Sequence, residues 1–246
     1  MILEDLRGHR ALVSGSTGGI GLAVVQALLG QGCAVVGLDV AEGPPLGAGY
    51  QHVRCDLGDA TALQAALALV TAHGPLDHVV NVAGIDPTYA LSAGGRAEWD
   101  RVLDIDLRAY YLVLHHCLEA LRAGAGKSIV NVSSINYQLG LPGRSIYSAA
   151  KAGILGLTRG LSRELGREGI RINTVSPGWV FTARQHREHF SGAAAAANLA
   201  HLARVQALEV HIRPEDIATH ILFYLSAASR ASTGHNCVVD GGWLLE

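Results

Sequence analysis

The sequence carries little charge and no stretch dominated by one charge sign. Among its 246 residues, 19 are Lys or Arg and 21 are Asp or Glu, which gives a formal net charge of -2. A basic stripe of the kind that nucleic-acid binding requires is missing, so we expect no DNA or RNA partner. Because only 16% of the residues are charged and 49% are hydrophobic, the composition is typical of a chain that folds around a large core.

Apolar runs long enough to cross a bilayer are also missing. The longest, residues 193–197 and 217–228, are short or interrupted by polar residues, whereas a spanning helix needs about 20. Residues 1–10 contain four charged side chains and lack the apolar core of a signal peptide. We therefore expect no membrane partner and a protein retained in the cytoplasm.

Closely spaced metal-binding or disulfide patterns are likewise lacking. Cys33, Cys55, Cys117 and Cys237 are widely scattered, so we expect free and mostly buried thiols. His186 and His189 form an HxxH pattern, but the sequence offers no third ligand nearby. We expect no metal site.

What the sequence does contain is an alternation of short apolar runs and longer helical patterns. Strands are predicted at 11–14, 34–39, 51–55, 78–82, 128–132 and 171–175, and helices at 20–30, 59–73, 98–121 and 145–168. Two of the runs, 34–38 and 78–82, are apolar without strict alternation, as expected for strands covered on both faces. The pattern predicts an α/β fold, with a single doubly wound parallel sheet of Rossmann type and helices on both faces. Without a linker or repeat, residues 1–246 are expected to form one domain.

Residues 183–209 interrupt this alternation. The segment is rich in Ala and His and has little β-propensity. Long insertions of this kind are often lids over a binding site, so we predict a small helical lid here. The alternative is a helical excursion on the surface without a role in binding.

A glycine-rich loop directly follows the first predicted strand. Its glycines at 15, 19 and 21 permit a tight turn and let backbone N–H groups approach a pyrophosphate. The spacing is GxxxGxG, and such loops also serve as plain turns. Asp39 ends the second strand, where a carboxylate can bond the adenosine ribose hydroxyls and repel a 2′-phosphate, although it could also be a solvated turn residue. Because residues 11–53 contain no Arg or Lys, we predict that the cofactor is NAD.

Three polar side chains are expected to meet near the end of the sheet that binds ligands. Tyr147 and Lys151 share one face of the predicted helix 145–168, because they are four residues apart. Ser134 lies just past the carboxyl end of strand 128–132, the edge where open α/β sheets bind ligands. A lone Tyr-x-x-x-Lys is common by chance and would be a surface pair, so the accompanying motifs matter.

Those motifs stand in the order found in the short-chain dehydrogenase/reductase family, which the sequence resembles over nearly its whole length. The matching blocks are residues 17–21, 55–57, 81–84, 131–134, 147–151, 173–178, 213–218 and 239–242. The resemblance implies an NAD-dependent enzyme that interconverts an alcohol and a carbonyl. Tyr147 would transfer the proton, Ser134 would bind the substrate oxygen, and Lys151 would lower the pKa of Tyr147. Ser134, not Ser133, stands 13 residues before the tyrosine, as in the family.

The expected cofactor contacts lie in the glycine-rich loop, at the strand ends and in the blocks that match the family. The loop and the strand end would contribute Gly15, Ser16, Thr17, Gly19, Ile20, Gly21 and Asp39. By resemblance, Asp56 and Leu57 would hold the adenine, Asn81, Ala83 and Gly84 would line the cleft, and Pro177, Gly178, Val180 and Thr182 would contact the nicotinamide amide, with Tyr147 and Lys151 beside it.

The substrate pocket is expected among the loops that follow strands four to six. With Ser134 and Tyr147, the candidate contacts are Asn136, Gln138 and Trp179, although each of these three could instead pack its loop. A mid-sized, partly polar secondary alcohol or ketone, such as a hydroxylated ring or a sugar-like compound, would fit. The direction stays open, so an NADH-dependent carbonyl reductase is an alternative, and a catalytically weakened NAD-binding sensor or scaffold is another.

One position departs from the family pattern. Family members commonly have Asn in the helix after the fourth strand, where it holds a water that connects the lysine to solvent, and this chain has Asp106. A carboxylate near Lys151 would form an ion pair or be partly protonated. We hypothesise an active enzyme with an altered pH profile, a tolerated substitution without consequence being the alternative.

Family members are usually tetramers, so we expect a homotetramer built through helices 98–121 and 145–168 and the C-terminal strand.

Overall fold

A parallel sheet of seven strands organises the computed structural model, which describes residues 3–245. The strands are β1 (Arg10–Ser14), β2 (Ala34–Asp39), β3 (Tyr50–Arg54), β4 (His78–Asn81), β5 (Ser128–Val132), β6 (Arg171–Pro177) and β7 (Asn236–Val239). Their order is β3-β2-β1-β4-β5-β6-β7, and every neighbouring pair is parallel. The predicted doubly wound sheet is confirmed.

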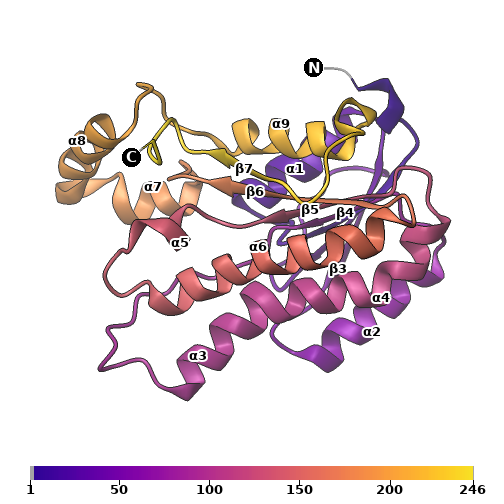
Figure 1. Ribbon diagram of the computed structural model, residues 1–246, viewed down its shortest axis with the longest axis horizontal. Helices are drawn as coiled ribbons and strands as arrows, with labels where there is room; N and C mark the ends of the chain where they lie inside the picture. Colours follow the sequence, from indigo (N-terminus) through magenta and orange to yellow (C-terminus); the bar gives the residue numbers. More distant parts are fainter. Residues whose placement is uncertain (1–2, 246) are drawn as a thin grey trace.

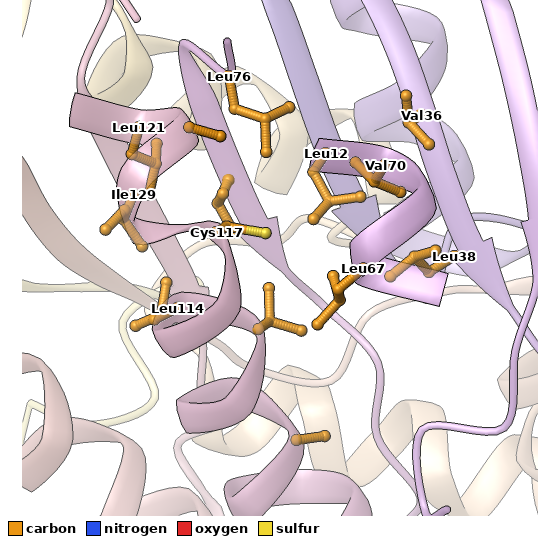
Figure 2. Packing of buried hydrophobic residues seen from close by; sticks show 14 of the residues in the cluster. Leu12, Val36, Leu38, Leu67, Val70, Leu76, Leu114, Cys117, Leu121 and Ile129 are labelled. Carbon is orange, nitrogen blue, oxygen red and sulfur yellow. The ribbon is translucent and has the colours of Figure 1, made fainter. Parts of the chain in front are cut away.

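Successive side chains of the central strands enter two different cores. Leu12, Val36 and Val79 belong to one apolar cluster, whereas their neighbours Val13 and Val80 belong to the other. Figure 2 shows the first cluster, where sheet residues meet residues of two helices such as Leu67 and Cys117. Full burial of each Val or Leu contributes roughly 1.5–3 kcal/mol. The apolar runs without alternation therefore reflect burial on both faces, as predicted.

Helices cover both faces of the sheet (Figure 1). Helices α1 (Gly19–Gly30) and α9 (Pro214–Leu225) lie on one face, and α2 (Ala60–Ala72), α4 (Ala109–Ala123) and α6 (Ser145–Gly166) lie on the other. Local sequence sets their starts: the Asp59 carboxylate accepts from the Thr61 and Ala62 N–H groups ahead of α2. Pro214 occupies the first turn of α9, where no backbone donor is needed.

The helix predicted at 98–121 is not continuous. It begins as α3 (Arg96–Leu103), passes through a π-helical turn, η2 (Asp104–Arg108), and resumes as α4. Single π-helical turns inside α-helices occur frequently at functional sites. This one carries the fully buried Asp106.

The segment predicted as a helical lid does contain helices. They are α7 (Ala183–His189) and α8 (Ala195–Val205), joined through the 3-10 turn η3 (Gly192–Ala194). Together with the short α5 (Asn136–Leu139), they lie beyond one end of the sheet (Figure 1). Movement of this segment as a lid stays a prediction.

Two further expectations concern the composition. All four cysteines are unpaired, with Cys33, Cys55 and Cys117 buried and Cys237 half-buried, as predicted. No helix within residues 3–245 combines the length and apolarity that crossing a membrane requires.

Candidate active site

The site lies where the strand order reverses between β1 and β4, at the carboxyl ends of these strands. There the glycine loop packs against the residues that follow β4. Gly15 has a φ of +70°, and a Cβ on it would lie 2.7 Å from the Ala83 Cα. A Cβ on Gly21 would collide with the Gly15 carbonyl group. Glycine at both positions therefore keeps the loop closed and its backbone N–H groups available to an anion.

A cavity of about 500 Å³ opens beside this loop. The predicted cofactor residues that line it are Gly15, Thr17, Gly19, Ile20, Gly21, Asp39, Asp56, Leu57, Ala83, Gly84 and Thr182. Val82, within the predicted range 81–84, lines it as well, and so do Val40, Ile85, Ile105, Arg184 and Arg187, which the sequence did not indicate as cofactor contacts. The two arginines come from α7, too far along the chain for any local motif to associate them with the loop. A cradle of glycines at a helix N-terminus beside a carboxylate fits a dinucleotide.

Asp39 is fixed at the end of β2. Its Oδ2 accepts from the Thr17 N–H at 3.0 Å and its Oδ1 from the Ala41 N–H at 3.1 Å. The carboxylate thus stands beside the glycine loop, on the wall of the cavity. The absence of cations from residues 11–53 is only part of the electrostatics, since Arg184 and Arg187 reach the same cavity.

Two predicted cofactor residues, Ser16 and Asn81, do not turn their side chains to the cavity. Ser16 is fully buried, and its hydroxyl lies 3.1 Å from the Tyr50 hydroxyl. Asn81 is also fully buried and donates from Nδ2 to the Asn131 Oδ1 at 3.0 Å. Both side chains therefore make hydrogen bonds inside the protein, behind the glycine-rich loop.

Ser134, Tyr147 and Lys151 line a second cavity of about 420 Å³, which is called the catalytic cavity below. The predicted nicotinamide contacts Pro177, Gly178, Val180 and Thr182 line it as well. Residues shared with the first cavity, including Ile20, Gly84 and Thr182, show that the two adjoin. The structure therefore brings the three residues together in a cavity that adjoins the glycine-lined cleft.

Ser134 is arranged to donate its hydroxyl hydrogen. Its Oγ accepts from the Asn136 N–H and from the Asn136 Nδ2, each at 3.2 Å. With those acceptor positions filled, the hydroxyl hydrogen can point to an oxygen in the cavity. Ser133, by contrast, donates to the Lys151 carbonyl oxygen at 2.8 Å and so fastens β5 to α6.

Opposing effects act on the phenol of Tyr147. Burial raises its pKa, the Lys151 charge lowers it, the Asp106 charge raises it, and a hydrogen bond from Ser134 lowers it. The pKa lies above its ordinary value of 10 as a result. The Lys151 Nζ lies 5.5 Å from the centre of the Tyr147 ring.

Behind the wall of the cavity, Lys151 forms a buried ion pair. Its Nζ lies 3.2 Å from the Asp106 Oδ2, and the Asp106 Oδ1 accepts from the Ile85 N–H at 2.8 Å. Burial lowers the pKa of Lys151, but the Tyr110, Asp106 and Tyr147 oxygens more than offset this, so the pKa is raised. Burial also raises the pKa of Asp106, against the opposing charge of Lys151. Asp106 lines neither cavity and acts on the site through Lys151.

Tyr110 completes this buried cluster, and no sequence signal pointed to it. The Tyr110 hydroxyl lies 3.0 Å from the Ala83 carbonyl oxygen and 3.1 Å from that of Val132. The Lys151 Nζ lies 5.5 Å from the Tyr110 ring centre. Burial raises the pKa of Tyr110, so it stays a neutral phenol that holds the strand ends around Lys151.

Two of the three loop residues predicted to contact the substrate line the catalytic cavity, and the third does not. Asn136 and Trp179 line the catalytic cavity, whereas Gln138 is exposed and does not. The Trp179 Nε1 donates to the Gln185 Oε1 at 2.7 Å, which connects the cavity wall to α7. Gln185 and His189, from the loop after strand six where the pocket is expected, line the cavity too, and so do His201 and Trp243, which the sequence did not indicate. Since Gln185, His189 and His201 belong to α7 and α8, the predicted lid segment borders the cavity. Among the described residues, no group of three His, Cys, Asp or Glu is placed to hold a metal.

Comparison with known proteins shows that the chain is similar to proteins named as reductases and dehydrogenases. The family described as Enoyl-(Acyl carrier protein) reductase matches residues 15–244. The chain is 33% identical to D-xylose 1-dehydrogenase of Caulobacter vibrioides, covering 98% of each chain. It is 37% identical to cis-4-hydroxycyclohexanecarboxylate dehydrogenase of Sinomonas cyclohexanicum, covering 95% of each. In fold it is similar to ligand-free aldohexose dehydrogenase of Thermoplasma acidophilum, with a TM-score of 0.90 and 24% identity over 99% of this chain and 97% of the other.

Proposed function

This chain belongs to the short-chain dehydrogenase/reductase family and is an oxidoreductase that uses NAD or NADP, and we propose that it oxidises a secondary alcohol to a ketone with NAD. The observation that carries the proposal is the meeting of Ser134, Tyr147 and Lys151 in one cavity that adjoins the glycine-lined cleft. We propose further that residues 1–246 act as one catalytic domain.

The side chains divide the proton chemistry among them. Tyr147, as phenolate, takes the proton of the substrate hydroxyl, and Ser134 donates a hydrogen bond to the oxygen as it becomes a carbonyl. A bound NAD⁺ would supply the hydride acceptor for this oxidation, held by cavity residues such as Gly178, Val180 and Thr182, and would add a positive charge to the site. A phenol of ordinary pKa ~10 needs about 4 kcal/mol of preferential stabilisation to ionise near pH 7. The buried Lys151 ammonium contributes to that stabilisation.

NAD is favoured over NADP by the position of Asp39. Its carboxylate, held by two backbone N–H groups on the cavity wall, would accept from ribose hydroxyls and repel a 2′-phosphate. Titration of the protein with NADH and with NADPH, followed by cofactor fluorescence, tests this choice. We expect NADH to bind at least about tenfold more tightly, and equal affinities would refute it.

The substrate is proposed to be a hydroxylated ring or a sugar-like compound. The cavity mixes apolar walls such as Trp179 and Leu139 with polar groups such as Asn136. Relatives named for D-xylose and for a hydroxycyclohexanecarboxylate act on compounds of this size. Sugars and cyclic hydroxy acids are therefore the first compounds to screen.

Ketone reduction is a second candidate, favoured by the state of Tyr147. Because the pKa of this phenol is raised in the cofactor-free protein, Tyr147 is protonated at neutral pH and ready to donate to a carbonyl oxygen. The ratio of forward to reverse rates at neutral pH, measured with one alcohol and its ketone, separates the two directions.

The test of the proposed function is NADH formation over a panel of alcohols, with Tyr147→Phe as the control variant. We expect turnover with at least one sugar or cyclic alcohol. Tyr147→Phe should remove it while the dissociation constant for NADH stays within about twofold. Retention of more than about a tenth of the rate would refute the role of Tyr147, and NADH binding without turnover on any compound would favour a sensor.

We also propose a homotetramer. The C-terminal strand presents Val238, 40% exposed, and beyond it Leu245 is 75% exposed, while Tyr111 of α4 is 49% exposed. Apolar side chains on β7 and on the outer helices would be covered by partner copies. Light scattering coupled to size exclusion gives the mass directly, and a monomer would refute the proposal.

A further inference from the structure

A third cavity, of about 510 Å³, lies beside the catalytic one. The two share Asp86, Arg144, Arg184 and His189 on their walls. Asp86 follows β4, Arg144 precedes α6 and Arg184 lies in the first turn of α7. Three segments far apart in the sequence therefore place charged side chains at the junction of the two cavities.

The charges at this junction are unequal. The Asp86 carboxylate is shared by two guanidinium groups, with its Oδ1 2.7 Å from the Arg184 Nη2 and its Oδ2 3.4 Å from the Arg144 Nη1. Arg144 also donates to the Asp86 carbonyl oxygen. A guanidinium has five N–H donors, and one carboxylate neutralises only one of the two cations.

The surroundings do not cancel the surplus. Arg101 adds a positive charge to the third cavity, and Glu188, 3.4 Å from Arg184, adds a negative one. Lys151 on the catalytic wall is already paired with Asp106 behind it. The walls of the third cavity thus carry three arginines and two carboxylates, a net charge of one positive unit within the described part of the chain, and the Arg144 side chain is only 20% exposed.

A second polar group on the same wall lacks a partner. The Asn136 Oδ1 is buried and accepts no hydrogen bond, although the Nδ2 of the same amide donates to Ser134. A buried amide oxygen without a partner carries an energetic penalty that a ligand hydroxyl would remove. Because Asn136 touches Ser134, that hydroxyl would stand next to the reacting carbon.

We propose that Arg144 and Arg184 bind a carboxylate of the substrate, so that the substrate class is a hydroxy acid or its oxo acid. Planar guanidinium groups suit a carboxylate because two parallel N–H donors match its two oxygens. The reacting hydroxyl lies at Ser134 and Tyr147, and the acid group reaches across the junction into the third cavity. This inference rests on the proposed function, since it takes Tyr147 as the reacting end.

The test measures binding without turnover. Protein saturated with NADH is titrated calorimetrically with cyclohexanecarboxylate and with cyclohexanecarboxamide, which match in shape but differ in charge. We expect the carboxylate to bind at least about tenfold more tightly, with a ratio that falls as salt is added. Arg144→Gln and Arg184→Gln should each bring the ratio close to one while carboxamide affinity changes by less than about twofold.

Two further variants set the scale. Arg144→Lys keeps the positive charge but loses the parallel N–H donors of the guanidinium, so an intermediate ratio of carboxylate to carboxamide affinity is expected. Arg167→Gln, a matched loss of charge at the far end of α6, should leave the ratio unchanged. If Arg144→Gln unfolds, Arg184→Gln still decides, because its side chain is 50% exposed.

Two results would overturn the substrate class: a wild-type ratio near one, or a ratio that both glutamine variants preserve. Turnover of neutral alcohols with no carboxylate preference would remove the hydroxy acid and leave the dehydrogenase standing. A preserved carboxylate preference without turnover of any alcohol or hydroxy acid would remove the dehydrogenase and leave the anion site.

Discussion

The two ends of β4 bury ionisable groups in opposite ways. At its start, His78 is fully buried, with its Nε2 3.0 Å from the Nδ1 of His9 and no partner for its own Nδ1. Burial lowers the pKa of His78 to about 3. Past its other end, Asp106 and Lys151 are just as buried, yet they form an ion pair against the catalytic cavity.

The difference shows what separates a structural ionisable group from a functional one. His78 meets the low-dielectric interior by staying neutral, whereas Lys151 stays charged because oxygens of Asp106, Tyr110 and Tyr147 surround it. Burial alone would mark both His78 and the Lys151 pair as candidates for a functional role. Only the charged cluster also lines a cavity, and only there can a charge act on a bound molecule.

Loss of the cation is the change expected to have the largest effect. Lys151→Met should lower kcat/KM for alcohol oxidation at least about a hundredfold, because the phenolate of Tyr147 loses its nearest positive charge. The same change leaves Asp106 as an unpaired buried carboxylate, which costs about 3–5 kcal/mol of stability. Steady-state kinetics and urea unfolding measure the two effects separately.

A double variant separates a catalytic role of Lys151 from a purely structural one. Lys151→Met with Asp106→Asn removes both charges, so most of the lost stability should return while turnover stays low. Recovery of turnover along with stability would show that Lys151 is only structural, like His78 at the other end of β4.

The start of β4 should govern acid stability. The folded protein keeps His78 neutral down to about pH 3, whereas the unfolded chain protonates it near its ordinary value of 6.5. The stability that this group supports is therefore complete above pH 6.5 and is lost as the pH falls. Between pH 6.5 and 5 the free energy of unfolding should fall by about 2 kcal/mol on account of His78.

Urea unfolding at several pH values measures this slope. His78→Asn should be less stable at pH 7 but flatter between pH 6.5 and 5, because its side chain does not titrate. His73→Asn changes an exposed histidine and should keep the wild-type slope. Equal slopes in wild type and His78→Asn would show that another group dominates acid unfolding.

The sheet could be predicted from the sequence because its signals are local. Runs such as 78–82 are apolar and bounded by turns, and strands buried on both faces show no alternation. The π-helical turn at Asp104–Arg108 could not be predicted. Its position depends on Asp106 reaching the Ile85 N–H and Lys151, contacts between segments that no local pattern records.

The site was predictable to the extent that it rests on motifs. Gly15, Asp39 and Tyr147 follow strands or start helices at fixed spacings, and the structure sets them on the cavity walls. Trp243 lines the catalytic cavity from the C-terminal residues, a contact that no local pattern indicates and only the folded chain shows. Asn81 lies in a segment that matches the family, yet its side chain donates to Asn131 and not toward the cavity. A sequence match therefore does not determine where a side chain points.

The smallest expected effect concerns the residue that opposes Lys151. The Asp106 charge raises the pKa of Tyr147, so Asp106→Asn should lower it and make the phenolate available at lower pH. Oxidation at pH 7 should quicken by on the order of threefold, the alkaline plateau should stay unchanged, and ketone reduction should slow. Asp104→Asn, in the same π-helical turn but paired with Arg108 near the surface, is the matched control. Superimposable pH–rate profiles for wild type and Asp106→Asn would mean that the ion pair holds Lys151 in place without tuning Tyr147, which would bring this end of β4 closer to the structural role of His78.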